Sequence, residues 1–172
     1  MKDANLILRK SLRPNWLKIK LDTSREFIKT QRLMRTQGLH TVCEEAKCPN
    51  IYECWSRQTA TIMILGNTCT RSCGFCSVKT GKPLNVNYNE PIRTAEAVKS
   101  MQLQHVVITS VDRDDLKNDY GATIWAETIR AIRNLAPECT IEVLTPDFRD
   151  YSPAYHKVFH AKPDIFSHNV EC

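Results

Sequence analysis

Residues 66 to 76 read Gly66-Asn67-Thr68-Cys69-Thr70-Arg71-Ser72-Cys73-Gly74-Phe75-Cys76 and follow the apolar run of residues 62 to 65. The cysteine spacing is CxxxCxxC, so one short loop supplies three thiolates. A four-iron cluster that is held by three thiolates keeps one iron without a protein ligand, and a small molecule can bind there. We therefore interpret Cys69, Cys73 and Cys76 as ligands of an iron–sulfur cluster.

Two other interpretations of this loop are a zinc knuckle and a set of buried cysteines. Structural zinc takes four ligands, usually in two close pairs, and this loop has no fourth Cys or His nearby. The spacing therefore favours the cluster.

A second cysteine motif lies upstream, with Cys43, Cys48 and Cys54 in CxxxxCxxxxxC spacing. This spacing is too wide for the CxxC pairs of zinc sites. Three cysteines within twelve residues indicate a second three-thiolate metal site, and the alternative is a cysteine cluster that only packs. We expect residues 50 to 55 to be helical, so that Cys48 and Cys54 face the same cavity.

The two remaining cysteines, Cys139 and Cys172, belong to neither motif, and we expect Cys139 to be a packed thiol. His156 and His160 lie four residues apart on a predicted helix, but no third ligand accompanies them. We therefore expect no metal at this histidine pair.

The composition is that of one sizeable globular domain, with 172 residues and 42% hydrophobic residues. No apolar run approaches the roughly 18 to 20 residues of a membrane span, and residues 1 to 20 have no secretory signal. Eight cysteines in such a chain indicate a reducing compartment. We expect a cytoplasmic protein that needs no membrane, or one in an organelle matrix if the N-terminus of the gene product is longer.

The positive charge is concentrated at the N-terminus. The net charge is +5, and residues 1 to 35 carry ten Lys or Arg residues against three Asp or Glu residues. A solvated face, an acidic protein partner and a nucleic acid are the alternatives. We expect no nucleic-acid partner, because no binding motif accompanies the charge.

From residue 61 onward, strand-like and helix-like segments alternate. Short β-type runs occupy residues 61 to 65, 105 to 109, 140 to 144 and 164 to 167, and helical segments occupy residues 94 to 104, 119 to 136 and 152 to 160. This order predicts an α/β fold of βα units on a parallel sheet. Before it we expect an extended arm over residues 1 to 22 and one helix that ends at Gly38.

The loops that follow the predicted strands carry polar residues, and in α/β sheets and barrels such loops hold the ligand. Thr109, Ser110 and Asp112 follow the second strand, and Asn169 follows the fourth. Glu142 is a charge within a β-type run, so we expect it to point inside the sheet or barrel. These five residues are the candidate cofactor contacts, with an ordinary charged loop as the alternative for residues 109 to 116.

Together the two motifs resemble lipoyl synthase, a family of the radical S-adenosylmethionine superfamily. The CxxxCxxC motif alone indicates the superfamily. The segments that make the match specific are TVCEEAKCPN at residues 41 to 50, TSVDRDDL at 109 to 116, LTPDF at 144 to 148 and HNVE at 168 to 171. The resemblance runs from about residue 13 to the last residue.

The resemblance implies two [4Fe-4S] clusters. Cys69, Cys73 and Cys76 would bind the cluster whose open iron chelates S-adenosylmethionine, which is cleaved to methionine and a 5′-deoxyadenosyl radical. Cys43 and Cys48, with Cys54, would hold an auxiliary cluster that is the sulfur source. The implied reaction is the insertion of sulfur at C6 and C8 of a protein-bound octanoyl chain, and no side chain is assigned as catalytic.

The implied partners are an octanoylated lipoyl carrier domain or H-protein, and a low-potential electron donor such as ferredoxin or flavodoxin. The family implies a partial β/α, TIM-like barrel, of which about four strands are present here. We expect residues 1–58 to hold the arm, the helix and the auxiliary motif, and residues 59–172 to hold the first part of the barrel.

The family's C-terminal Arg-Ser-Ser-Tyr stretch, whose serine binds the auxiliary cluster, has no counterpart in this sequence. We therefore interpret the chain as the N-terminal portion of such an enzyme. A catalytically impaired iron–sulfur protein, acting as an electron carrier or a cluster-binding module, is the alternative function, and a zinc-binding interaction module is a third.

Overall fold

The computed structural model describes residues 14, 24–57 and 59–169. Its elements are α1 (Arg25–Thr36), β1 (His40–Thr41), α2 (Val42–Glu45), α3 (Ile51–Ser56), β2 (Thr61–Ile64), α4 (Glu90–Met101), β3 (His105–Ser110), α5 (Ala122–Leu135), β4 (Thr140–Thr145), η2 (Phe148–Asp150), α6 (Ser152–His160) and β5 (Ile165–His168). The predicted arm over residues 1 to 22 lies outside the described residues, except for Pro14.

One five-stranded sheet, in the order β1-β2-β3-β4-β5, forms the centre of the fold. Strands β2 to β5 are parallel, with Thr61 opposite Val107 and Glu142 opposite both Val107 and Ile165. The four predicted parallel strands are therefore confirmed. The fifth strand, β1, was not predicted; it pairs antiparallel with β2 and is too short to carry a pattern.

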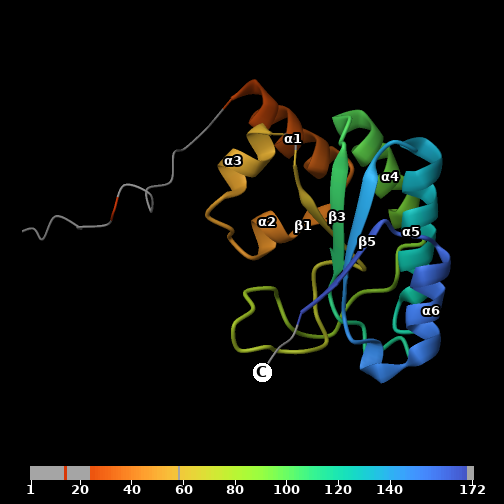
Figure 1. Ribbon diagram of the computed structural model, residues 1–172. Coiled ribbons are helices and arrows are strands. Elements are labelled where there is room, and N and C mark those ends of the chain that lie inside the picture. Colours follow the sequence, from red (N-terminus) through yellow and green to blue (C-terminus); the bar gives the residue numbers. More distant parts are fainter. Residues whose placement is uncertain (1–13, 15–23, 58, 170–172) are drawn as a thin grey trace, which may run out of the picture.

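Helices α4, α5 and α6 lie together on one face of the sheet, as Figure 1 shows. Side chains alternate along the strands, so Val106, Ile108, Ile141 and Val143 point toward these helices and are fully buried. The opposite face carries half-buried residues such as Thr109 and Glu142. We call this second face the open face of the sheet.

The N-terminal helices form a smaller aromatic cluster. The Phe27 ring of α1 stacks on Tyr52 at 5.2 Å between ring centroids and lies 5.5 Å from Trp55, both of α3. Trp55 has an exposed fraction of 0%, and its carbonyl oxygen accepts a hydrogen bond from Thr30 Oγ1. This packing joins α1 to α3 and so fixes the segment that carries the first cysteine motif.

The helix boundaries differ from the predicted ones where backbone features decide them. Helix α4 begins at Glu90 rather than residue 94, because Pro91 is tolerated in a first turn. Helix α5 begins at Ala122, after Gly121 with a φ of +88°. Among the described residues, no helix has both the length and the apolar character that crossing a membrane requires.

Candidate functional site

The CxxxCxxC loop leaves the C-terminal end of β2 and closes on itself. The Cys69 amide donates to Lys79 O at 2.8 Å, and the Gly81 amide donates to Cys69 O at 2.9 Å. Cys69 and Thr80 thereby form an isolated parallel bridge. The three cysteines thus lie on a closed lobe, which we call the cysteine lobe (residues 69–81).

Leu65 joins β2 to this lobe, and its backbone is fixed on both sides. Its amide donates to Glu90 Oε2 at 2.7 Å, and its carbonyl accepts from Arg113 Nη1 at 3.2 Å. Both partners are buried, with exposed fractions of 5% for Glu90 and 3% for Arg113. Burial raises the pKa of Glu90, and its hydrogen bonds from the Leu65 and Gly66 amides oppose that shift. The direction in which the chain leaves the sheet is therefore set by buried polar groups.

Arg71, between the first two cysteines of the lobe, binds carboxylates from two other loops. It donates to both oxygens of Asp114 at 2.8 Å each and to both oxygens of Asp147 at 2.9 and 2.7 Å. A third carboxylate, Asp112, lies 3.4 Å from Arg71 Nη1. These contacts raise the pKa of Arg71, first through Asp114 and then through Asp147, so this side chain is a permanent cation.

Cys69 is half-buried and contacts both Asp112 and the Arg71 backbone. Its Sγ lies 3.6 Å from Asp112 Oδ2 and accepts from the Arg71 amide at 3.4 Å. Burial raises the pKa of the Cys69 thiol. Cys73 is also half-buried, whereas Cys76 is exposed, so the lobe presents its last cysteine toward solvent.

The first cysteine motif is held by short helices. Cys43 lies on α2 and is buried, Cys54 lies on α3, and Cys48 lies in the turn between them. The Cys48 amide donates to Cys43 O at 3.0 Å. Burial, followed by the charges of Cys43 and Cys48, raises the pKa of Cys54.

The donor chemistry of both motifs fits an iron–sulfur cluster better than a single ion. Within the part of the chain that the structure describes, no three Cys, His, Asp or Glu side chains are gathered as ligands of one metal ion. A single zinc ion needs its sulfur ligands at about 2.3 Å from one point, whereas thiolates around a four-iron cluster surround a larger body. Sets of three thiols suit the cluster, and this assignment stays a prediction.

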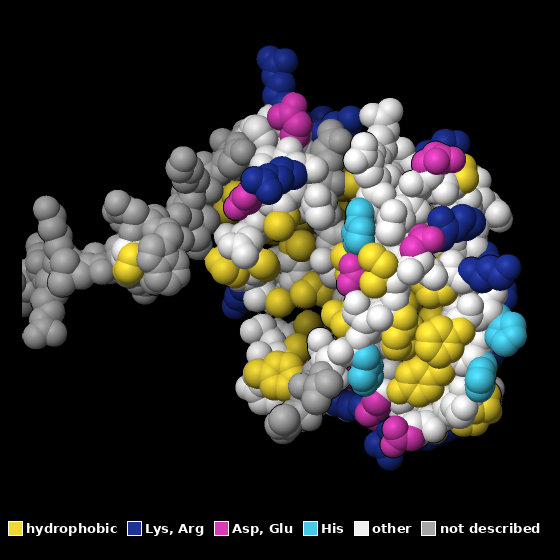
Figure 2. Space-filling view, viewed as in Figure 1, with side chains coloured by type: hydrophobic (Ala, Val, Ile, Leu, Met, Phe, Trp, Pro, Cys, Tyr) yellow, Lys and Arg dark blue, Asp and Glu magenta, His cyan; other side chains and the backbone are white. Residues whose placement is uncertain are grey.

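The two motifs border the same hollow. Figure 1 places α2 above the lobe that follows β2, and Figure 2 shows the surface hollowed between the N-terminal helices and this lobe. Hydrophobic side chains line part of the hollow (Figure 2).

Three of the five predicted cofactor contacts lie near this region, on the open face or at the lobe. Thr109 Oγ1 donates to Leu144 O at 3.0 Å. Glu142 lies between two neighbouring strands, with His105 Nε2 at 3.0 Å from its Oε2 and Ser167 Oγ donating to its Oε1 at 2.8 Å. Asp112 contacts Cys69, as described above.

The other two contacts are placed differently. Strand β3 extends through Ser110, so Ser110 and Thr109 point to opposite faces of the sheet. Ser110 Oγ is buried and has no hydrogen-bond partner among the described residues. Asn169 directly follows β5 and is exposed. The structure therefore does not bring all five residues together.

The remaining ligand-type residues lie apart from the cysteine motifs. Cys139 has an exposed fraction of 2% and donates to Thr140 O, which agrees with a packed thiol. His156 and His160 are both exposed, and His160 Nδ1 lies 2.6 Å from His156 O.

Sequence reasoning missed Arg71, Glu90 and Arg113, which hold the lobe. A signal for Arg71 exists in the sequence, because a single cation within the cysteine motif pairs well with the acidic run of residues 112 to 115. The contacts of Glu90 and Arg113 with the backbone of Leu65 carried no such signal, although Arg113 also pairs with Asp115 two residues along the chain.

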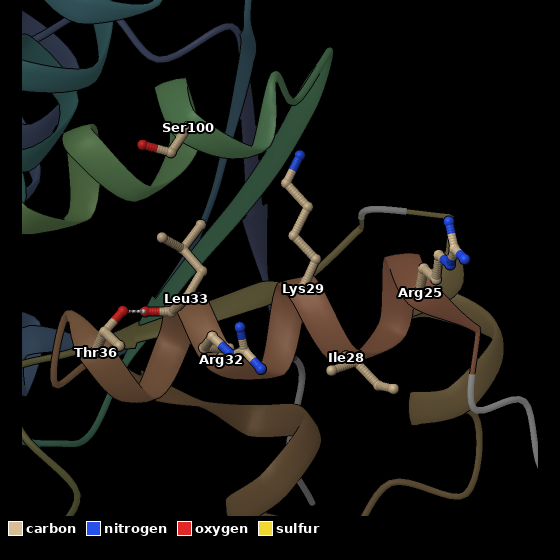
Figure 3. Close-up of a pocket in the computed structure, with 7 residues that line it drawn as sticks. All are labelled: Arg25, Ile28, Lys29, Arg32, Leu33, Thr36 and Ser100. Carbon is tan, nitrogen blue, oxygen red and sulfur yellow. Dashed lines mark hydrogen bonds between the residues drawn. The ribbon is translucent and has the colours of Figure 1, made fainter.

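Two cavities accompany these features. A polar one of about 260 Å³ adjoins the start of the lobe and is lined by Asn67, Thr68, Glu90 and Arg93, among others. A second, of about 380 Å³, lies along α1 against Ser100 of α4, where Arg25, Lys29 and Arg32 surround Ile28 and Leu33 (Figure 3). In Figure 1, α1 lies at the other end of the strands from the lobe.

Comparisons with known proteins match nearly the whole chain. Residues 63–172 match the model of the radical SAM superfamily, and residues 3–48 match the N-terminal domain of lipoyl synthase of that family. Curated relatives include the lipoyl synthases of Symbiobacterium thermophilum, 57% identical over 94% of this chain and 50% of the relative, and of Rubrobacter xylanophilus, 55% identical over 92% and 49%. The lipoyl synthase of Christiangramia forsetii is 50% identical over 92% of this chain and 54% of the relative. The chain thus spans about half the length of the curated relatives it matches.

Proposed function

The chain belongs to the lipoyl synthases of the radical SAM superfamily, and from that premise we propose that the protein inserts two sulfur atoms into an octanoyl chain. The sulfur atoms enter at C6 and C8, and the octanoyl chain is attached to a lipoyl carrier domain or H-protein. A low-potential donor such as ferredoxin or flavodoxin supplies the electrons. The family implies an iron–sulfur cluster and S-adenosylmethionine as cofactors.

The observation that carries the proposal is that one three-thiol motif lies on α2 and α3 and the other on the lobe after β2, the two segments between which the surface is hollowed (Figures 1 and 2). Cys69, Cys73 and Cys76 would hold the cluster that binds S-adenosylmethionine. The first motif, with Cys43 and Cys48, would hold the auxiliary cluster. When bound, these groups supply a radical that abstracts unactivated hydrogen atoms and the sulfur that replaces them, which no side chain supplies.

The contribution of the chain itself is placement. Glu90 and Arg113 fix the start of the cysteine lobe from within the core. Glu142, on the open face, is held by His105 and Ser167 and offers a fixed carboxylate to a polar ligand. We propose Glu142, Thr109, Asp112 and Asn169 as contacts of S-adenosylmethionine. Ser110, the fifth predicted contact, has a buried hydroxyl on the opposite face of the sheet and is not part of this proposal.

Three cysteine variants test the proposal. Each protein is reconstituted anaerobically with iron and sulfide, reduced with S-adenosylmethionine, and given an octanoylated carrier peptide. We expect Cys73→Ala to abolish 5′-deoxyadenosine formation. Cys48→Ala should keep that cleavage but yield no sulfur-containing product.

Cys139→Ala is the matched control, because this cysteine is buried outside both motifs, and it should retain both activities. Loss of cofactor cleavage on Cys48→Ala alone would contradict the division of roles. A wild-type protein with a well-formed cluster but no 5′-deoxyadenosine would identify a cluster-binding protein without this activity.

A further inference from the structure

Arg71 lies within the CxxxCxxC motif, and its guanidinium binds carboxylates from other loops. Four hydrogen bonds connect its guanidinium to Asp114 and Asp147, at 2.7 to 2.9 Å, and each pair uses both carboxylate oxygens. A guanidinium has five N–H donors in a fixed fork, and such two-oxygen pairs combine charge with a defined direction. The geometry therefore specifies the position of Arg71 as well as its charge.

The partners of Arg71 come from the ends of two neighbouring strands. Asp112 and Asp114 follow β3, and Asp147 follows β4, whereas Arg71 follows β2. One side chain thus ties the loop of one strand to the loops of the next two.

The partners are themselves held in place. The Asp114 amide donates to Thr70 Oγ1 at 3.0 Å, and Thr70 in turn donates to Asp112 O through both its amide and its hydroxyl. Tyr155 Oη donates to Asp147 O at 2.8 Å. These contacts hold the main chain of the three acidic residues, so the carboxylates are restricted in the positions they can take around Arg71.

An ordinary surface ion pair is the alternative, and such pairs contribute little to stability. The two-oxygen geometry argues against it, and so do the exposed fractions of the Arg71 and Asp114 side chains, which are 25% and 20%; the Asp147 side chain is more open, at 43%. Arg149 provides a contrast in the same cluster: it is 59% exposed and approaches Asp114 only to 3.7 Å.

We propose that Arg71 is a positioning residue, which fastens the cysteine lobe to the ends of β3 and β4 so that Cys69, Cys73 and Cys76 are arranged before iron binds. This inference rests on the proposed cluster-binding role of the lobe. Cys69 would be the most affected cysteine, because its Sγ accepts from the Arg71 amide and adjoins Asp112. Cys73 and Cys76 belong to the same lobe, so Arg71 would position them as well.

The test compares Arg71→Lys with Arg71→Gln in the metal-free protein. Lysine keeps the charge but loses the fork, and glutamine loses both. Alkylation by iodoacetamide is followed for each cysteine by mass spectrometry. We expect Cys69 to react about tenfold faster in both variants, as loss of one charge-assisted hydrogen bond allows. Cys54, in the first motif, should react at the wild-type rate.

The matched control is Arg149→Gln, which removes a positive charge from the same acidic cluster without removing a bond to the lobe. Its Cys69 should react at the wild-type rate. A second measurement is the midpoint potential of the reconstituted cluster, followed by electron paramagnetic resonance. Arg71→Gln should shift it to lower potential, because a nearby cation favours the reduced cluster, and Arg71→Lys should not.

A wild-type alkylation rate of Cys69 in Arg71→Lys would overturn the inference. If Arg71→Gln fails to fold, Arg71→Lys still tests the inference, because lysine keeps a positive charge among the three carboxylates. Equal acceleration of Cys54 would likewise overturn it, since general loosening would then explain the result. Failure of the wild-type protein to assemble a cluster would instead contradict the proposed function, and the alkylation rates would still judge Arg71.

Discussion

The two cysteine motifs are held by different forces. The first lies on α2 and α3, and its position depends on the packing of Trp55 and Tyr52 against Phe27. The second lies on a lobe with exposed side chains, such as Phe75 at 71% exposure, and depends on charged groups that reach it from elsewhere. One site is thus shaped by burial and the other by hydrogen bonds to ionised side chains.

This difference predicts separate sensitivities. Packing responds to the loss of volume, whereas charge-assisted contacts respond to the loss of a donor, a charge or a proton. A change in the aromatic cluster should therefore disturb the first motif and leave the second in place. Changes around Leu65 should disturb the second motif and leave the first in place.

The largest expected effect is that of Trp55→Ala. It removes a fully buried ring, and such a change lowers the free energy of unfolding by about 3 to 5 kcal/mol. Chemical denaturation measures the loss, and alkylation under native conditions should show Cys54 accelerated more than Cys69. Trp125→Ala is the control, because Trp125 is equally buried but lies on α5. If both variants accelerated Cys54 alike, the aromatic cluster would not be what holds the first motif.

A smaller effect is expected for Gly121→Ala, which disturbs the start of the lobe. The added Cβ would lie 2.5 Å from Leu65 Cδ1, at a residue with φ +88°. Overpacking and the positive φ together should cost about 1 to 3 kcal/mol in the free energy of unfolding. Gly74→Ala is the control, since its Cβ would meet no atom within 4 Å. An unchanged unfolding free energy for Gly121→Ala would show that Leu65 yields easily.

Glu90→Gln should change the pH dependence of stability. The pKa of Glu90 is raised from the ordinary glutamate value, mainly by burial. A raised pKa gives a stability contribution that is present below the unfolded pKa of about 4.3 and is lost as the pH rises through the folded pKa. The variant lacks this loss, so its stability relative to wild type should rise with pH, by at most about 1.4 kcal/mol per pH unit. Denaturation curves between pH 4 and 8 measure it, and parallel curves for the two proteins would refute it.

The smallest effect is expected for Cys139→Ala. Removing one buried sulfur resembles removing one methyl group, which costs about 0.5 to 1.5 kcal/mol. Iron content and the alkylation rates of both motifs should stay at wild-type values. A loss of iron would mean that Cys139, which lies outside both motifs, is also an iron ligand.

Much of the fold followed from the sequence because its signals are local. The spacing of the cysteines and the β-type runs both lie within short stretches, and the strand beginning at Thr140 starts where it was predicted to start. The extension of β3 by one residue was not visible, and it places Ser110 on the face opposite Thr109. Alternation makes such a small difference decisive.

The contacts that hold the lobe could not be predicted in the same way. Arg71 and Asp147 are 76 residues apart, and their meeting depends on the order and register of the sheet. Glu142 was suspected because it is a charge within a strand, but its partners His105 and Ser167 are fixed only by the pairing of three strands. Local patterns reveal donor types, whereas register decides which donors meet.

The bridge between Cys69 and Thr80 also bears on motion. The Cys69 amide is bonded to Lys79, far along the loop, so its proton exchanges with solvent only when the lobe opens. The Cys76 amide is bonded to Cys73 O within its own turn, and a brief local fluctuation releases it. Amide exchange should therefore be slow at the first cysteine and fast at the last. Such a gradient would mean that the loop is rigid near Cys69 and more mobile near Cys76.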